Sequence, residues 1–280
     1  MFWRAIATER QKESMARIVP TEYSSIDIDT DGFVYGVVST IDTTRQFDGS
    51  MLLHKLNPMG VDVKRYDRFP PAGDLLWTWD EEAEMWEISR FVDVAVHPYG
   101  LYSALDSYRG RVFTYDSNGD LLYIFGGLGD RLGQFGNPAA IAVTSDYRFL
   151  VLDNKYNQIV EFQPTEYGSL INQAEEENAR RRFDESERLW QEALKYTARS
   201  ELVLSKIGQA YMSQGDYEKA MEYMKYAGDK SNYSTSFESY RRQVMDSAFG
   251  PFMTVCLVLI AAYIVWKIVR RRRKRKGGTA

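Results

Sequence analysis

The chain has 280 residues, of which 26% are charged and 44% hydrophobic, and its formal net charge is −4. These values are typical of globular protein, and the length allows one or two hydrophobic cores. Lys267 and the run Arg270 to Lys276 hold eight basic residues, so the total of −4 leaves residues 1–266 with a net charge of about −12. An acidic body without a basic face argues against binding to nucleic acid.

The N-terminal sequence MFWRAIATERQKES is charged throughout and has no apolar core of a signal peptide. Residues 1–19 place Ile6, Met15 and Ile18 among charged residues, which predicts a helical or linker segment. The single cysteine, Cys256, lies near the C-terminus, so the body cannot contain a structural disulfide. This excludes a disulfide-stabilised secreted domain and leaves a cytosolic protein or a bacterial surface protein.

A repeated pattern of alternating apolar and polar residues follows Pro20. The stretches SSIDIDTDGFVYGVVS, VDVAVHPYGLYSALD and AIAVTSDYRFLVLD each predict a strand, a polar turn and a strand. Two sets of residues fall in equivalent places in these stretches: Asp29, His97 and Thr144, and then Gly32, Gly100 and Tyr147. The spacing is 47 residues between the last two repeats and 68 between the first two, where an insertion or a long connection intervenes.

Each repeat continues into a second predicted strand pair: SMLLHKLNPMGVDVKR, RVFTYDSNGDLLYIFG and NQIVEFQPTEYG. Four strands per repeat are typical of a propeller blade, so residues 20–168 predict about three blades of a β-propeller. Because propellers have about four to eight blades, three would form an open arc.

The stretch GGLGDRLGQFGNPAAIAVTSDYRFLVLDNKYNQIVEFQPTEYG resembles an NHL-repeat blade. The resemblance implies that polar residues after the second strand fix the turns of a blade through bonds from side chain to backbone. In this sequence these residues are Asp106, Asp153, Asn154 and Asn157. A structural role is therefore expected for them in preference to ligand binding.

Residues 169–247 have helical periodicity. FDESERLWQEAL and YEKAMEYMKYA align at a spacing of 34 residues, which is typical of the tetratricopeptide (TPR) repeat. The expected packing residues of two helical hairpins are Phe183, Trp190, Ala193, Gly208, Tyr211, Tyr217, Ala220 and Ala227. A last helix near 235–247, with Thr235 and Glu238 as a capping box, would cap the stack.

The concave side of such a stack is a candidate peptide groove, expected at Leu202, Ser205, Gln209 and Met212. None of these is Lys or Asn, so a clamp for chain-terminal carboxylates is not expected, and a more apolar ligand is left open. The alternative is that the two hairpins form only a rigid spacer.

No charged residue lies between Ala248 and Trp266, and these 19 residues would span roughly 28 Å as a helix, close to the hydrocarbon thickness of a bilayer. Residues 248–269 therefore predict one transmembrane helix through the lipid bilayer. Its expected interface residues are Tyr263, Trp266, Lys267, Arg270 and Arg271. The basic tail, residues 270–280, should stay in the cytoplasm, which places the body outside. The alternatives are a buried core helix and a tail-anchored cytoplasmic adaptor.

The sequence offers little for catalysis. The two histidines, His54 and His97, cannot supply a three-histidine metal site, and no phosphate loop or nucleophile motif occurs. Asp27, Asp29 and Asp31 lack the glycine and distal glutamate of a calcium loop, so turn formation is the better interpretation. No catalytic, cofactor-binding or metal-binding residue is assigned, and no enzyme activity is expected.

From Phe2 to Val269, the order of parts resembles a family of bacterial membrane-anchored proteins with an NHL propeller, a TPR pair and a membrane span. The fold class expected is thus a multidomain β + α protein with a partial propeller, TPR-like hairpins and one transmembrane helix. The resemblance implies an N-terminally incomplete member at the cell membrane, associated with sugar-import machinery. The expected function is an extracytoplasmic scaffold that binds a protein or an envelope glycan. The alternative is a lactonase- or lyase-like propeller enzyme whose site is completed by absent blades.

Overall fold

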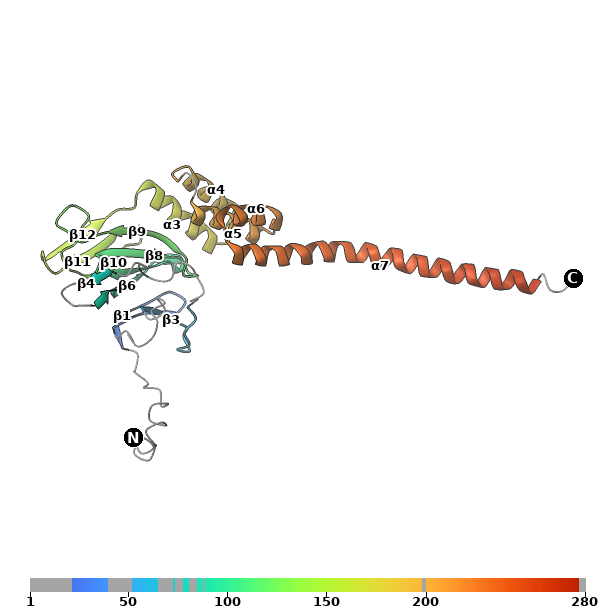
Figure 1. The fold of residues 1–280 in the computed structure, drawn as a ribbon, viewed down its shortest axis with the longest axis horizontal. Coiled ribbons are helices and arrows are strands. Elements are labelled where there is room, and N and C mark those ends of the chain that lie inside the picture. Colours follow the sequence, from blue (N-terminus) through green and yellow to red (C-terminus); the bar gives the residue numbers. More distant parts are fainter. Residues whose placement is uncertain are drawn as a thin grey trace, which may run out of the picture. The chain divides into compact units, whose positions relative to one another are not determined.

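The computed structural model describes residues 22–39, 52–64, 73, 78–80, 85–87, 89–197 and 200–276. The predicted segment 1–19 lies outside these residues. The chain divides into two compact units, Met1–Arg181 and Arg182–Ala280, which we call the strand unit and the helical unit. Figure 1 shows the strands in blue to yellow-green and the helices of the second unit in yellow to red.

Three antiparallel sheets make up most of the strand unit. The first sheet contains β1 (Tyr23–Ile28), β2 (Val34–Val38) and β3 (Leu53–Leu56). The second contains β6 (Phe91–Val96), β7 (Tyr102–Asp106), β8 (Arg111–Tyr115) and β9 (Leu121–Gly126). The third contains β10 (Pro138–Val143), β11 (Phe149–Asp153) and β12 (Gln158–Phe162). The stretch between the first two sheets, which lengthens their spacing, includes a two-stranded hairpin, β4 (Thr78–Asp80) and β5 (Met85–Glu87).

Only the second sheet has the four strands expected for each repeat. Among the described residues, the fourth strand of the first sheet is reduced to a single bridge between Leu56 and Asp62. In the third sheet the predicted last strand is wrong, because Thr165 instead caps helix α3 (Glu166–Ala179) by accepting a hydrogen bond from the Gly168 backbone N–H.

The turn between the first two strands has the same form in all three sheets. The backbone N–H of its first residue donates to the carbonyl four residues later: Asp29 to Phe33 at 3.0 Å, His97 to Leu101 at 2.8 Å and Thr144 to Arg148 at 2.9 Å. The fourth residue of each turn has a positive φ: 84° at Gly32, 81° at Gly100 and 61° at Tyr147. These are the positions that the sequence repeats made equivalent.

Successive sheets pack face to face around two apolar cores. The core between the first and second sheets consists of Tyr35, Val37, Leu52, Leu53, Phe91, Val94, Tyr102, Ala104, Phe113 and Tyr115. The core between the second and third sheets consists of Ala95, Leu105, Val112, Phe135, Ile141, Phe149 and Val151. The second sheet is therefore covered on both faces by its neighbours, as a propeller blade is.

The first strands of the three sheets are neighbours, and carboxylates link them. The backbone N–H of Val96 on β6 donates to Asp27 of β1, and that of Ile141 on β10 donates to Asp93 of β6, both at 2.7 Å. These bonds join β1, β6 and β10, which are the edge strands of their sheets, in this order.

Helix α3 belongs to the strand unit, although the sequence analysis grouped residues from 169 onward with the helical repeats. Tyr123 of β9 donates to Asn172 of α3 at 2.9 Å. The guanidinium of Arg180 stacks on Tyr99, in the 3₁₀ turn η1 (Pro98–Gly100), and donates to its hydroxyl. These side chains hold α3 to the second sheet.

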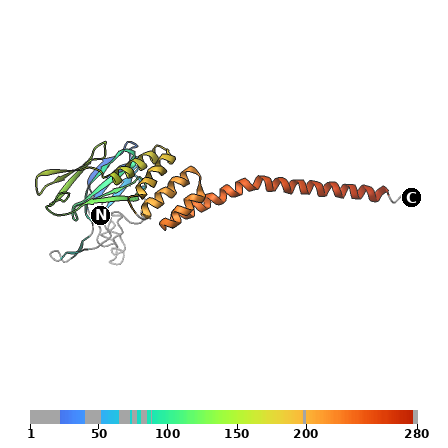
Figure 2. The same cartoon turned by 90° about the horizontal axis from the view of Figure 1, so that it is seen from above.

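The helical unit contains α4 (Phe183–Leu194), α5 (Glu201–Gln214), α6 (Tyr217–Ala227) and α7 (Lys230–Lys276). Gly215 and Gly228 end α5 and α6 in the left-handed conformation, with φ of 83° and 70°. Asp216 caps the start of α6 by accepting from the Lys219 backbone N–H. Figure 2 shows the same helices from above.

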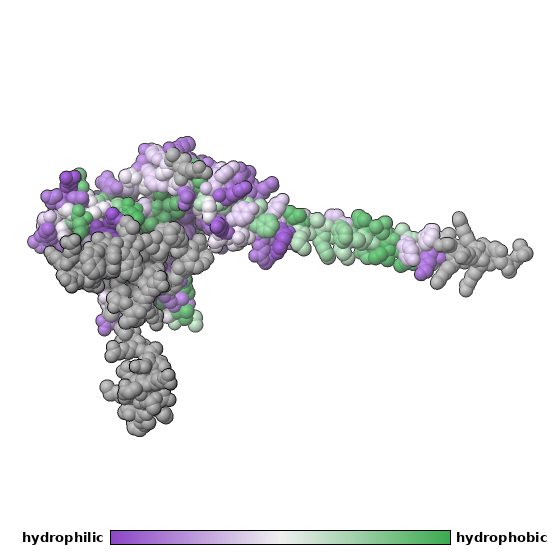
Figure 3. All heavy atoms as spheres, in the orientation of Figure 1, coloured by the Kyte–Doolittle hydropathy of each residue, from purple (hydrophilic) through white to green (hydrophobic). Residues whose placement is uncertain are grey.

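Helix α7 is continuous through the two segments that the sequence analysis separated. The predicted capping box is wrong, because Thr235 lies inside the helix and donates to the Ser231 carbonyl, while Asp229 accepts from the Asn232 backbone N–H at the helix start. Pro251 lies within the helix. The part from Lys230 to Lys267 is long and apolar enough to cross a membrane, and Figure 3 shows its apolar surface in green.

Candidate functional site

The predicted blade-turn carboxylates hold backbone N–H groups. Asp106 accepts from Arg90, Tyr108 and Arg109 at 2.9–3.2 Å. Asp153 accepts from the backbone of Gly136 at 2.6 Å, Asn137 at 3.0 Å and Lys155 at 3.0 Å. Both carboxyl groups are buried, so they serve the turns that precede and follow their strands.

Two opposing effects determine the pKa of Asp153. Burial by itself would raise it, but the backbone donors, beginning with Gly136 and Asn137, outweigh burial and hold the pKa below its ordinary value. Asn157 takes a positive φ of 50°, and Gly110 takes the equivalent position after Asp106 with a φ of 60°. Asn154 donates its backbone N–H to Asn137 and exposes its side chain.

Two of the aspartates considered for calcium have structural partners. Asp27 accepts from Val96, as described above, and Asp29 accepts from the backbone of Asp31 and Phe33 at 3.0 and 2.8 Å. In the described part of the chain, no group of three His, Cys, Asp or Glu side chains is placed to hold a metal ion.

The predicted groove residues of α5 are half-buried rather than open. Ser205 donates to Asp229 at 2.6 Å, and Gln209 donates to Ser205 at 3.3 Å. The structure thus joins two of the four groove residues to the turn before α7, and Leu202 and Met212 lie beside them on the same helix. Asp229 was missed by the sequence analysis, although its place after Gly228 is typical of a helix N-cap.

The predicted packing residues of the helical unit are mostly buried. Trp190, Ala193, Ala220 and Ala227 are buried, whereas Phe183 and Tyr217 are half-buried. A side chain at Gly208 would meet Met224 at 2.8 Å and the Ala220 carbonyl at 3.2 Å, so glycine permits the close approach of α5 and α6. Tyr211 stacks on Tyr223 and donates to Glu187 of α4.

The predicted membrane-interface residues lie along the last part of α7. The Tyr263 and Trp266 rings are 6.1 Å apart, and the Lys267 ammonium lies 5.8 Å from the Tyr263 ring. Arg270 and Arg271 continue the helix toward Lys276.

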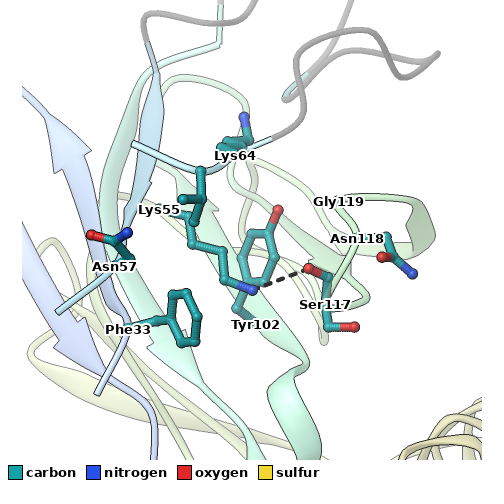
Figure 4. A pocket seen from close by; sticks show the side chains of 9 residues that line it. Phe33, Lys55, Asn57, Lys64, Tyr102, Ser117, Asn118 and Gly119 are labelled. Atoms are coloured by element: carbon teal, nitrogen blue, oxygen red, sulfur yellow. Dashed lines mark hydrogen bonds between the residues drawn. The ribbon is translucent and has the colours of Figure 1, made fainter. Parts of the chain in front are cut away.

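A cavity of about 400 Å³ lies between the first and second sheets and was not predicted. It is lined by Phe33, Lys55, Asn57, Val63, Lys64, Tyr102, Ser117, Asn118 and Gly119. Figure 4 shows these side chains, which come from the turns and strand ends at one edge of the two sheets. The volume falls within the range of small-ligand sites.

Lys55 of β3 is the central charged group of this cavity. Its ammonium lies 5.1 Å from the ring centroids of both Phe33 and Tyr35, and it donates to the Ser117 carbonyl at 3.1 Å. Burial lowers the pKa of Lys55, and the nearby carboxylates, Asp29 foremost, only partly oppose this shift. The bond to Ser117 and the two ring contacts hold the lysine side chain against aromatic surface.

Two turns with the same hydrogen-bond pattern carry Asn57 and Asn118, whose amide side chains line the cavity. Asn57 accepts from the backbone of Met59 and Val61 at 3.0 and 2.9 Å. Asp116 does the same for Asn118 and Asp120 at 2.9 and 2.7 Å. The sequence signal was the recurrence of NPMG and DSNG after equivalent strands, which fixes the turns but does not reveal that they face one cavity.

The floor of the cavity is aromatic and rigid. Tyr102 is buried and stacks on Tyr115 with centroids 5.2 Å apart, and Tyr35 lies 4.9 Å from it on the other sheet. The described lining residues therefore combine aromatic faces with amide, hydroxyl and ammonium groups, and none of them is acidic. This arrangement can hold a ligand that has both apolar faces and hydroxyl groups.

A serine–histidine pair also exists, deep in the second sheet. The Nε2 atom of His97 lies 2.8 Å from Ser103 Oγ, which bonds onward to Thr114 at 2.7 Å. All three side chains are buried, so no substrate reaches the serine hydroxyl. The pair therefore forms part of the core and not an active site.

Comparison with known proteins gives only partial similarity. No protein-family description matches the chain, and no curated protein matches it. Among solved structures, catalytically inactive virginiamycin B lyase from Staphylococcus aureus with quinupristin is similar at 13% identity and a TM-score of 0.26, over 54% of this chain and 58% of that one. A streptogramin B lyase structure is similar at 13% identity and a TM-score of 0.25, over 55% and 58%. The chain thus spans less than two thirds of the length of these propeller-type lyases.

Proposed function

We propose that this protein is a membrane-tethered binding module that holds an envelope glycan in the cavity between the first two sheets. In this proposal α7 is the anchor, the strand and helical units lie outside the cytoplasm, and the repeats are of the NHL and TPR types. Its action is binding and not catalysis.

The observation that carries the proposal is the composition of the cavity around Lys55. Sugar rings offer apolar C–H faces that pack on aromatic rings, and hydroxyl groups that bond to amides and ammonium groups. Phe33 and Tyr102 supply the rings, while Asn57, Asn118 and Lys55 supply polar groups. Because the turns that carry Asn57 and Asn118 are fixed by hydrogen bonds, the cavity is preorganised for its ligand.

The anchor is supported by the surface of α7. Leu257, Val258, Leu259 and Ile260 occupy successive positions around the helix and all are exposed. No other described segment of the chain covers these side chains, and a bilayer would supply the missing apolar contacts. The basic run after it favours a cytoplasmic tail and an external body.

A protein partner at the helical unit remains a second prediction from the sequence. Leu202 and Met212 are half-buried and Ser205 is bonded to Asp229, so this face offers less free hydrogen-bonding capacity than the cavity of the strand unit. An association with sugar-import machinery would accord with glycan binding.

The test is glycan binding by the full chain in lipid nanodiscs. A panel of neutral and uronic-acid oligosaccharides is titrated by calorimetry, and the wild-type protein should bind members of the panel. We expect Phe33→Ala and Asn118→Ala each to weaken that binding at least tenfold, or about 1.4 kcal/mol. Asn154→Ala, an exposed asparagine on the third sheet, is the matched control and should bind as the wild type does.

If the folded wild-type protein binds none of the panel, the glycan proposal fails. If Phe33→Ala and Asn118→Ala bind like the control, the glycan occupies another surface and the assignment of the cavity is wrong.

A further inference from the structure

The cavity around Lys55 contains a buried hydroxyl group that the described part of the fold does not use. The Tyr102 side chain is only 2% exposed, and its hydroxyl has no hydrogen-bond partner among the described residues. Figure 4 shows this hydroxyl among the side chains that line the cavity. Burial raises the pKa of Tyr102, so the hydroxyl keeps its proton at neutral pH and acts as a donor. A buried donor without an acceptor costs free energy, and a ligand with an acceptor group would remove that cost.

The other polar groups of the lining also define what a ligand must offer. Two acceptors are already bonded within the chain: the Ser117 carbonyl accepts from Lys55, and Asn57 Oδ1 accepts from the backbone of its own turn. The Lys55 ammonium and the Asn57 amide keep further N–H atoms to donate. Asn118 donates to Asp116 at 3.5 Å, which leaves its Oδ1 atom as an acceptor. The lining therefore suits a ligand group that has a strong acceptor beside a donor, as an amide has.

The charges around Lys55 argue against an ionic group on the ligand. The carboxylates of Asp29, Asp116 and Asp31 all act on the pKa of this lysine, so they lie near enough to repel an anion. A ligand ammonium group would instead meet Lys55 and Lys64, which both line the cavity. A neutral ligand group avoids both repulsions.

Apolar surface lies beside these donors. Phe33, Val63 and the ring of Tyr102 line the same cavity, and a methyl group gains free energy by leaving water for such a surface. The cavity thus offers donors for a carbonyl, an acceptor for an N–H group and apolar walls for a methyl group, with little tolerance for charge.

We propose that the cavity recognises the acetamido group of an N-acetylated amino sugar. Its carbonyl accepts from Tyr102 and Lys55, its N–H donates to Asn118, and its methyl group packs against Phe33 and Val63. The inference rests on the proposed function and names the class of glycan that is bound.

The test compares matched trisaccharides by calorimetry, with the full chain in lipid nanodiscs. Tri-N-acetylchitotriose carries acetamido groups where cellotriose carries hydroxyl groups and chitotriose carries amino groups. We expect the wild type to bind the acetylated trisaccharide about tenfold more tightly than either of the other two.

Tyr102→Phe removes only the hydroxyl group. Because no described group bonds to that hydroxyl, the variant should keep the circular dichroism spectrum and the melting temperature of the wild type. Its affinity for the acetylated trisaccharide should fall about tenfold, while its affinity for cellotriose should change much less. Tyr156→Phe, the same change at an exposed tyrosine between β11 and β12, is the matched control and should bind as the wild type does.

The outcomes separate this inference from the glycan proposal. A wild-type protein that binds cellotriose, chitotriose or a uronic-acid oligosaccharide as tightly as the acetylated trisaccharide retains the glycan proposal and overturns the inference. A protein that binds no oligosaccharide at all overturns both. If Tyr102→Phe binds the acetylated trisaccharide as the Tyr156→Phe control does, the acetamido group lies outside the cavity and the inference is wrong.

Discussion

At the scale of single residues, several buried polar side chains in the strand unit bond to backbone or to one another and serve the fold. Asp106 and Asp153 each hold three or more backbone N–H groups, and His97 is bonded to Ser103 in the core. Losing such a partner leaves buried donors unpaired, which costs more free energy than the bond itself contributes. These residues therefore specify the repeat, and the ligand binding that we propose is assigned to half-buried groups such as Lys55.

His97 makes the stability of the strand unit depend on pH. Burial lowers its pKa to about 3, against about 6.5 in an unfolded chain. Since the unfolded state binds the proton first, the free energy of unfolding should fall as pH decreases below about 6.5, by roughly 2 kcal/mol at pH 5. Urea unfolding of the wild type at pH 7 and pH 5 measures this change. His97→Gln should show a smaller loss over the same interval, and equal losses in the two proteins would contradict the assignment to His97.

At the scale of elements, close packing in the helical unit depends on one glycine. Gly208 of α5 faces Met224 and Ala220 of α6, where an added Cβ would lie 2.8 Å from a side-chain carbon and 3.2 Å from a backbone oxygen. The carbonyl belongs to a regular helix and cannot move away, so the two helices must separate to admit a larger residue.

Gly208→Ala should therefore destabilise the helical unit by about 1–3 kcal/mol, despite the better helix propensity of alanine. Gly168→Ala in α3 is the matched control, because its added carbon would meet neighbours at ordinary distances of 3.5 Å or more. Gly168→Ala should leave the free energy of unfolding unchanged or raise it slightly. Thermal unfolding followed by far-UV circular dichroism measures both, and a neutral Gly208→Ala would show that α5 and α6 are less closely packed than described.

At the scale of the whole molecule, the membrane is the largest partner that the chain's chemistry indicates. Helix α7 is long and apolar enough to cross a membrane, and the apolar segment is not covered by other described residues. For the basic residues after it, the positive-inside rule predicts the cytoplasmic side.

Leu259→Arg at the centre of this segment should weaken membrane insertion by roughly 3 kcal/mol. Flotation with liposomes should then recover much less of the variant than of the wild type. Val244→Arg, the same change on the same helix before the apolar segment, should float normally.

Protease added to intact bacterial cells tests the sidedness: digestion of the body supports an external body, and protection supports a tail-anchored cytoplasmic protein.

The sequence by itself determined the features that depend on local periodicity: the equivalent turns at Asp29, His97 and Thr144, the helices with buried Trp190 and Ala220, and the apolar span. Strands are recognised by apolar residues at every second position, helices by apolar residues about every 3.6 positions, and the last two repeats by their spacing of 47 residues. Local rules failed at Thr165, which caps a helix where a strand was predicted, and at Thr235, because Asp229 six residues earlier caps the start of the helix.

Only the tertiary structure decided which residues share a surface. The cavity joins Phe33 of the first sheet to Asn118 of the second, and the cores on the two faces of the second sheet are recognised only when the packing of the sheets is known. The physical reason is that burial and ligand contact depend on how whole sheets pack, whereas one sequence repeat produces the same side chain pattern whether or not a neighbouring sheet covers it.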